Sequence, residues 1–440
     1  MKKHLPLLFF LIFPIIAFGQ WTQSLSYYAD KCNIKIGTAV GGVFYNNYDT
    51  GNAYDLTVKN NFNILVAENE MKWDAMEPSN NSFNFTKADQ LTAYAFRTGK
   101  QVRGHNLCWH SQLPSWISNG LTNGIANGTF TRTTLMSILK NHITTIMTRY
   151  IGKVQQWDVL NEPFNDSGGT LRNSIWQQVI GNDYIDSVFV WAHRADPTAK
   201  LYLNDYGVEF SGGTKADAMY NYVSGMKSRN IPITGVGLQC HFTVSGNFNV
   251  SGLDANLKRY NALGLEAIIT ELEVKILKTD YTANSTLQLS NQAECYRRLI
   301  RLCLDNPNCK TFMTWGFTDL YSWIPGFTPA YDYSLLFDTN YAPKPAYFSI
   351  LNELAVESQK TGLNDINDAD IVKIQKLDNR IVVNSDNRIA RCQLFDVQGK
   401  CLFVSESHSS TIEIPSNNLQ QAIYILKLRM ENGKIIVKKF

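Results

Sequence analysis

Eight short apolar segments recur between residues 33 and 319, and stretches with helical spacing separate them. Each segment has the length of a buried strand rather than of a helix. Strands that alternate with helices are typical of a parallel sheet, and eight of them close into a barrel. The sequence therefore predicts an α/β fold of the (β/α)8 or TIM-barrel class. The predicted strands are Asn33–Val40, Phe62–Glu68, Gln101–Trp109, Val154–Glu162, Lys200–Tyr206, Gly235–His241, Glu266–Val274 and Thr311–Asp319, and the helices include Lys87–Gly99, Thr134–Ile151, Asn182–Ala195, Lys215–Arg229 and Leu289–Leu304.

Two of these segments carry a carboxylate directly after an apolar run. Glu162 ends the run that begins at Trp157, and Glu271 follows Ile268-Ile269-Thr270. In a barrel the carboxyl ends of the strands carry the chemistry, so both glutamates should reach the same face. Hydrolysis of a glycosidic bond needs such a pair, one acid and one nucleophile or base. Most glutamates in proteins are surface residues, but two in this setting favour a catalytic pair.

The other strand ends carry polar and aromatic side chains suited to a carbohydrate, because rings stack on sugar faces and rigid polar groups bind the hydroxyls. A lone histidine is more often structural than catalytic, but His105 stands among several such residues. The sequence shows no phosphate loop, metal-binding motif or basic cluster, and the net charge is only +3. We therefore expect no cofactor, no metal and no nucleic acid partner. The candidates are Glu68, Asn69, Lys72, His105, Trp109, His110, Gln112, Trp116, Asn204, Asp205, Tyr206, Gln239, His241, Trp315 and Trp323.

Seven motifs, in order along residues 34–347, resemble family 10 of the glycoside hydrolases, the endo-β-1,4-xylanases. The resemblance spans nearly all of the predicted barrel. It implies hydrolysis of xylan with retention of configuration, with the acid/base on the fourth strand and the nucleophile on the seventh. The motifs are ENEMKW (68–73), RGHNLCWHSQLPSW (103–116), WDVLNEP (157–163), NDYG (204–207), GVGLQCH (235–241), ITELEV (269–274) and WGFTDLYSW (315–323).

The same resemblance implies roles for individual residues. Glu162 matches the acid/base and Glu271 the nucleophile. Asn161 matches the residue that holds the sugar 2-hydroxyl at the cleavage position. His241 and Asp158 match a pair that hydrogen-bonds to the nucleophile and orients it. The matched substrate-binding positions are Glu68, Asn69, Lys72, His105, Trp109, Gln112, Gln239, Trp315 and Trp323.

Three residues depart from the family pattern. Glu273 stands where the family usually has Asp, Gly207 replaces a usual Asn, and Cys240 occupies a position where a small residue such as Ser is common. Because strands alternate with period two, Glu273 should point the same way as Glu271, further toward the rim. Its extra methylene could shift the nucleophile slightly.

The chain begins with a basic Met1-Lys2-Lys3, an apolar run and small residues before Gln20. This pattern predicts a secretory signal peptide at residues 1–19 and a secreted or cell-surface protein. Export permits disulfides, and among the eight cysteines Cys303 and Cys309 flank a short turn that favours a bridge. Cys108 and Cys240 lie in apolar strands and are expected to be buried thiols.

After Leu354 the sequence changes character. The catalytic domain is predicted at residues 20–357, a polar linker at 358–370, and at 371–440 a small antiparallel β-sandwich of short alternating runs. This tail resembles the C-terminal sorting domains of the type IX secretion system, which would make the export machinery a partner. A carbohydrate-binding module is the alternative, but residues 371–440 contain no tryptophan to stack on a sugar.

The leading hypothesis is an endo-acting retaining xylanase that works as a monomer on polysaccharide. No insertion is seen that would wall off the cleft, which favours internal cleavage. A related β-1,4-glycanase acting on glucan or mixed linkages is the nearest alternative. A non-catalytic polysaccharide-binding protein of the cell surface is a third, although a mere binder would need neither carboxylate.

Overall fold

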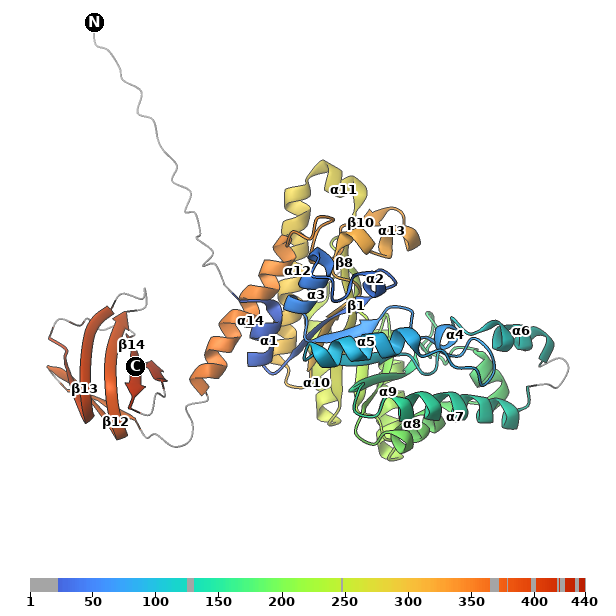
Figure 1. Ribbon diagram of the computed structural model, residues 1–440, viewed down its shortest axis with the longest axis horizontal. Coiled ribbons are helices and arrows are strands. Elements are labelled where there is room, and N and C mark those ends of the chain that lie inside the picture. The colour runs from blue at the N-terminus through green and yellow to red at the C-terminus, as the bar shows by residue number, and fades with distance from the viewer. Residues whose placement is uncertain are drawn as a thin grey trace, which may run out of the picture.

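A closed parallel barrel forms the centre of the larger part of the chain (Figure 1). The computed structural model describes residues 23–124, 130–246, 248–364, 372–377, 379–396, 401–417, 419, 424–431 and 435–439. Neighbouring barrel strands pair in parallel. The last strand pairs both with the strand before it and with the first strand, and this closes the ring. The predicted eight strands are confirmed as β1 (Lys35–Val40), β2 (Ile64–Ala67), β3 (Gln101–His105), β4 (Gln156–Asn161), β5 (Lys200–Asp205), β6 (Gly235–Leu238), β8 (Glu266–Leu277) and β9 (Thr311–Thr314).

Helices surround the barrel, and all five that were predicted by range are present. In α7, for example, Thr131 and Thr134 form a capping box at the start, and Leu135, Leu139 and Ile143 recur at the spacing of one buried face. The larger helices are α3 (Ala53–Asn61), α5 (Thr86–Arg97), α6 (Ser115–Gly124), α7 (Arg132–Arg149), α8 (Tyr184–Ala195), α9 (Thr214–Ser228), α10 (Val250–Ala262), α12 (Ser285–Asp305) and α14 (Pro345–Asn364). Short elements are α1 (Leu25–Lys31), α2 (Phe44–Asn47), α4 (Trp73–Met76), η1 (Trp176–Ile180), α11 (Lys278–Ala283), η2 (Asp319–Tyr321) and α13 (Ile324–Phe327).

The strands β4 and β8 each contain a register shift close to a predicted catalytic glutamate. In β4 the shift lies between Asp158 and Leu160, and in β8 it lies between Ile269 and Leu272. Such a bulge breaks the alternation of side chains and re-aims them. Beyond it, β8 continues past the barrel and pairs with β7 (His241–Thr243) and β10 (Tyr331–Asp332).

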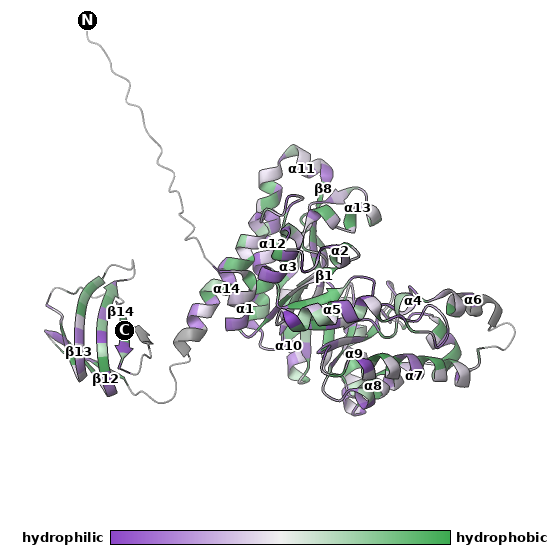
Figure 2. Ribbon diagram, in the orientation of Figure 1, coloured by the Kyte–Doolittle hydropathy of each residue, from purple (hydrophilic) through white to green (hydrophobic). Residues whose placement is uncertain are grey.

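The barrel interior is tightly packed near its closing seam. Ile64, Val66, Met313 and Trp315 form one buried cluster inside the barrel. A side chain on Gly37 could not fit there, because its Cβ would lie 2.7 Å from the carbonyl oxygen of Ile64. In Figure 2 hydrophobic residues concentrate on central strands such as β1, whereas the surrounding helices alternate between hydrophobic and hydrophilic residues.

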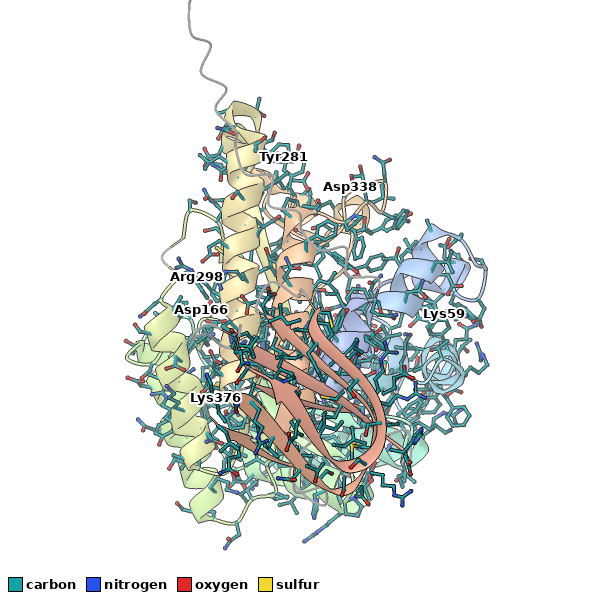
Figure 3. All side chains as sticks on the ribbon, turned by 90° about the vertical axis from the view of Figure 1, so that its left-hand side faces the viewer. Lys59, Asp166, Tyr281, Arg298, Asp338 and Lys376 are labelled. Carbon is teal, nitrogen blue, oxygen red and sulfur yellow. A yellow bond between two sulfur atoms is a disulfide. The ribbon has the colours of Figure 1, made fainter. Side chains whose placement is uncertain are left out.

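The C-terminal part forms one curled, five-stranded antiparallel sheet, which Figure 3 shows facing the viewer. Two runs predicted as separate strands are continuous here: 381–383 and the described part of 390–397, residues 390–396, belong to one long strand that shifts register between Asn384 and Ile389. Its own buried cluster includes Ile381, Leu394 and Leu426. The strands are β11 (Lys373–Lys376), β12 (Arg380–Asp396), β13 (Cys401–Pro415), β14 (Tyr424–Met430) and β15 (Ile435–Lys439).

Other predictions about the chain have mixed outcomes. The predicted bond between Cys303 and Cys309 is present, and Cys108 and Cys240 are buried free thiols as expected. The linker prediction was partly wrong, because α14 stays helical from residue 358 to Asn364. The rest of that linker, and the predicted signal peptide at 1–19, lie outside the described residues. Among the helices that the structure describes, none is long and apolar enough to cross a membrane.

Candidate active site

Asn204, near the end of β5, ties the two carboxylate-bearing strands together. Its Nδ2 donates to Asn161 Oδ1 at 2.9 Å and to Glu271 Oε1 at 2.7 Å. Its Oδ1 accepts from the Thr270 hydroxyl at 2.7 Å, and its backbone oxygen accepts from the Glu162 amide at 2.8 Å. One residue therefore contacts both bulged strands, β4 and β8.

The prediction that Asn204 binds sugar hydroxyls is wrong. The residue is fully buried, and both hydrogens of its amide are donated within the protein. Consecutive residues Thr270 and Glu271 both reach it, which strict alternation would forbid and the bulge in β8 allows. Gly237 on β6 leaves the space, because a Cβ there would overlap Asn204 Oδ1 and lie 2.9 Å from the Thr270 methyl group.

Glu271 is buried and held in its ionised form. Burial alone would raise the pKa of this carboxyl, but His241, His105 and the Asn204 hydrogen bond outweigh it and lower the pKa to about 2. The nearest atom of His241 is Nε2, 3.6 Å from Glu271 Oε2. Glu271 is therefore a carboxylate at any ordinary working pH, as a nucleophile has to be.

His241 lies between Glu273 and Gln239. Its Nδ1 is 2.6 Å from Glu273 Oε1, and its Nε2 is 2.9 Å from Gln239 Oε1. Burial by itself would lower the pKa of His241, but the charges of Glu273 and Glu271 raise it to about 10. The ring is thus an imidazolium that donates from both nitrogens.

Glu273 lies two residues beyond Glu271 along β8, in the part of the strand that follows the bulge. It is completely buried, and the pairing of β7 with β8 places it opposite His241. Glu273 has a longer side chain than the Asp that the resemblance leads one to expect, and its carboxylate contacts the imidazole of His241. This position supplies the counter-charge to His241.

Asp158 was expected to hydrogen-bond to the nucleophile together with His241, but it makes no such bond here. Its carboxylate instead accepts from both Arg103 Nε, at 3.0 Å, and Arg103 Nη2, and lies 2.9 Å from His105 Nδ1. The cause is its strand position, since His105 on β3 is the register partner of Asp158. Arg103 was missed, although a charge inside an apolar strand is a signal that could have found it.

Glu162 has a left-handed backbone conformation, with φ of 51°, directly after β4. Trp109 Nε1 donates to its Oε2 at 2.8 Å, and Gln239 Nε2 donates to its Oε1 at 3.1 Å. Because Gln239 also accepts from His241, one hydrogen-bond network runs from Glu162 through Gln239 and His241 to the neighbourhood of Glu271.

Several predicted substrate-binding residues gather next to Trp109. Lys72 Nζ donates to Asn69 Oδ1 at 3.0 Å and to Gln112 Oε1 at 2.6 Å, and it lies 5.1 Å from the centre of the Trp109 ring. Burial lowers the pKa of Lys72, while Glu271 and Glu68 act against that change. Burial also raises the pKa of Glu68.

Aromatic rings complete the site. Trp315 packs edge to face against His105, with ring centres 5.1 Å apart, and Trp323 does the same against His241 at 5.6 Å. Both tryptophans thus border residues that influence Glu271. Within the part of the chain that the structure describes, no group of three or more histidines, cysteines or acidic residues could hold a metal ion.

Tyr206 lies on the side of Glu162, in a cluster that the sequence did not reveal. Its hydroxyl contacts Asp166 and accepts from Arg172 at 3.2 Å, and Lys215 Nζ lies 3.7 Å from its ring centre. Lys215 also pairs with Asp205 at 2.8 Å. Asp166 and Arg172 belong to the loop after Glu162, whose polar composition resembles that of any surface loop. Asp166 is the member of this cluster labelled in Figure 3.

Comparisons with known proteins bear on both parts of the chain. The family described as "Glycosyl hydrolase family 10" matches residues 24–353, and a domain of unknown function (DUF8694) matches residues 360–440. Endo-1,4-beta-xylanase B of Thermotoga neapolitana is 39% identical over 81% of this chain and 99% of its own length. Endo-1,4-beta-xylanase C of Phanerodontia chrysosporium is 38% identical over 69% of this chain and 73% of its own.

Solved structures of xylanases are also similar to this chain. Native xylanase 10B from Thermotoga maritima has a TM-score of 0.72 and 38% identity, covering 77% of this chain and 99% of that one. Xylanase 10B from Thermotoga petrophila RKU-1 in complex with xylobiose has a TM-score of 0.71 and 38% identity, covering 76% and 98%.

The role of Asn204 can be tested by comparing Asn204→Ala with Asn204→Asp. Losing the donor should cost about 1–3 kcal/mol of unfolding free energy in Asn204→Ala. Asn204→Asp should cost more at pH 7, because it adds a buried carboxylate beside Glu271. Urea unfolding followed by tryptophan fluorescence measures this in the barrel, since residues 371–440 lack tryptophan.

The extra loss of unfolding free energy in Asn204→Asp should become smaller as the pH falls. An acid with a raised folded-state pKa costs stability only above its unfolded pKa of about 3.9. The difference between the two variants should therefore shrink by about 1–3 kcal/mol from pH 7 to pH 5. A difference that stays constant would contradict the contact between residue 204 and Glu271.

Proposed function

This chain belongs to glycosyl hydrolase family 10, and from that premise we propose that it is an endo-1,4-β-xylanase that cleaves xylan with retention of configuration. The observation that carries the proposal is the hydrogen-bond network that holds Glu162 from β4 and Glu271 from β8 at one end of the barrel. Two carboxyl groups with unlike surroundings are what a double displacement requires.

Glu271 is the proposed nucleophile. It attacks the anomeric carbon and forms a covalent glycosyl-enzyme intermediate, for which it must be ionised. The pKa of about 2 supports this role, because it keeps the carboxylate free of a proton. His241 and Asn204 contact the Glu271 carboxylate and hold it in one orientation.

Glu162 is the proposed acid/base. It donates a proton to the leaving oxygen in the first step and removes one from water in the second. The donors Trp109 Nε1 and Gln239 Nε2 fix its carboxyl group from two sides, so proton transfer occurs at one place. Its left-handed backbone turns the side chain away from the line of β4.

Sugar binding is proposed for the remaining candidates. Asn161 Nδ2 is buried without a hydrogen-bond partner while its Oδ1 accepts from Asn204, which suits a donor to the 2-hydroxyl. The joined group of Lys72, Asn69 and Gln112 would bind hydroxyls beside the Trp109 ring. The full proposed set is Glu68, Asn69, Lys72, His105, Trp109, Gln112, Tyr206, Gln239, Trp315 and Trp323.

The C-terminal residues 371–440 are proposed to be a sorting domain that engages a type IX export machinery, on a monomeric enzyme that is secreted or displayed at the cell surface. The sequence at residues 1–19 supports passage of a first membrane as a signal peptide. The curled sheet has a hydrophobic cluster of its own, which supports a unit separate from the catalytic domain at 20–357.

Product analysis tests the enzymatic proposal. On soluble xylan the protein should release a range of oligosaccharides from internal cleavage, and NMR of the first products should show the β-anomer. An α-anomer would contradict retention. Equal or faster cleavage of cellulose or glucomannan would favour the broader β-1,4-glycanase, and no cleavage of any of these would favour a binding protein.

Glu162→Ala separates the two carboxylates. Hydrolysis of xylan should fall by about 10²–10⁴-fold, because the leaving sugar needs a proton. The burst of leaving group from an aryl xyloside that needs no proton should keep most of its rate. Glu271→Ala is the matched control and should lose both reactions. If Glu162→Ala lost both equally, the acid assignment would be wrong.

Truncation after Asn364, the end of α14, tests the tail. The shortened protein should keep nearly the same kcat/KM on soluble xylan, because the barrel closes its own core. In the native host it should accumulate in the periplasm, measured by fractionation. If export proceeded and binding to insoluble xylan were lost instead, the tail would be a carbohydrate-binding module.

A further inference from the structure

The turn Gln239-Cys240-His241 delivers two side chains to the site, one to each glutamate. Gln239 donates to Glu162, and His241 lies 3.6 Å from Glu271. The turn separates β6 from β7, and Cys240 adopts a left-handed conformation with φ of 62°. For a residue other than glycine this backbone region costs about 1–3 kcal/mol, so surrounding contacts must hold it.

The contact that holds the turn at Cys240 comes from a residue that is not among the candidate site residues. The Cys240 amide, which cannot continue the strand ladder, donates to Glu209 Oε1 at 3.0 Å. The preceding amide stays in the sheet, since Gln239 donates to the Asp205 carbonyl. An amide bonded to a carboxylate is among the stronger hydrogen bonds of a protein interior.

Glu209 is itself held rigidly. It is 4% exposed, in the segment between β5 and α9. Asn256 of α10 donates to the carbonyl oxygens of both Val208 and Glu209, at 2.8 and 2.9 Å. A chain of buried contacts therefore leads from α10 through Glu209 to the turn at Cys240.

We propose that Glu209 is a positioning residue for the reaction: its carboxylate fixes the left-handed turn at Cys240 and so aims Gln239 at Glu162 and His241 at Glu271. The inference rests on the proposed roles of these two glutamates. Glu209 touches neither substrate nor a reacting atom in this scheme. It acts through the backbone of the turn.

The Cys240 thiol is consistent with a structural role at this turn. Burial raises its pKa, and Glu209 and Glu273 act in the same direction, so the side chain stays a neutral thiol between two carboxylates. The sulfur is fully buried. The part of the residue that the site uses is its amide.

The test is a double-mutant cycle of Glu209→Ala with Cys240→Gly. Glu209→Ala should lower kcat on xylan by about 10–100-fold with little change in KM, because small misplacements of reacting groups are costly. Glycine adopts φ near 62° without strain, so the loss should be at least several-fold smaller in the Cys240→Gly background. The same loss in both backgrounds, or none in either, would overturn the proposal.

Two further variants separate positioning from loss of folding. Glu209→Gln keeps an acceptor oxygen and should lose clearly less activity than Glu209→Ala. Glu266→Ala removes a partly buried carboxylate at the opposite end of the barrel, bonded to Lys200 and Tyr202, and should lower stability without changing kcat. If Glu209→Gln lost as much as Glu209→Ala, charge rather than the hydrogen bond would be decisive and the proposal would fail.

A spectroscopic readout distinguishes this proposal from the proposed function. The ring N–H signals of His241, assigned by their absence in His241→Gln, should shift or broaden in Glu209→Ala. That change would support the positioning role even if the protein cleaved no xylan. Unchanged His241 signals in an active enzyme would overturn the positioning role and leave the proposed function intact.

Discussion

A positive charge on His241, enclosed by Glu271 and Glu273, is the interaction on which the rest of the site depends. An unpaired buried carboxylate would cost several kcal/mol or take up a proton, and either outcome would disable a nucleophile. The imidazolium between them places a positive charge 2.6 Å from Glu273 Oε1 and 3.6 Å from Glu271 Oε2. Glu273, where the family resemblance leads one to expect Asp, contacts the ring at 2.6 Å. The Trp323 ring packs edge to face against His241.

The barrel supplies rigidity, but its regular geometry alone would not place the two glutamates. A shift of register in β4 and another in β8 turn side chains out of strict alternation. Asn204 can bind both shifted strands because Gly237 leaves room for its amide. The regular barrel therefore holds the bulged segments of β4 and β8 in place, and these segments position the two glutamates.

The sequence was sufficient to predict the eight strands, because buried parallel strands are continuous apolar runs. It also indicated which residues gather at the strand ends. It was not sufficient to predict which neighbour each side chain binds. Asp158 was expected to bond to the nucleophile and Asn204 to the substrate. Instead, the register with β3 places Asp158 beside His105, and Asn204 is buried and bonded to Glu271. In the tail, short alternating runs were expected as separate strands, but β12 bends without ending, which hydrophobic alternation cannot show.

The barrel's first and last helices meet at the end of the molecule away from the chemistry. Helix α1 leads into the amino end of β1, and the Cys32 thiol donates to the Leu354 carbonyl of α14 at 3.3 Å. The last turns of α14 thus lie toward the amino ends of the strands, whereas Glu162 and Glu271 lie at the carboxyl ends. An enzyme tethered through its tail would therefore be held on the side opposite its two glutamates, and a long polymer could reach them without meeting the anchor.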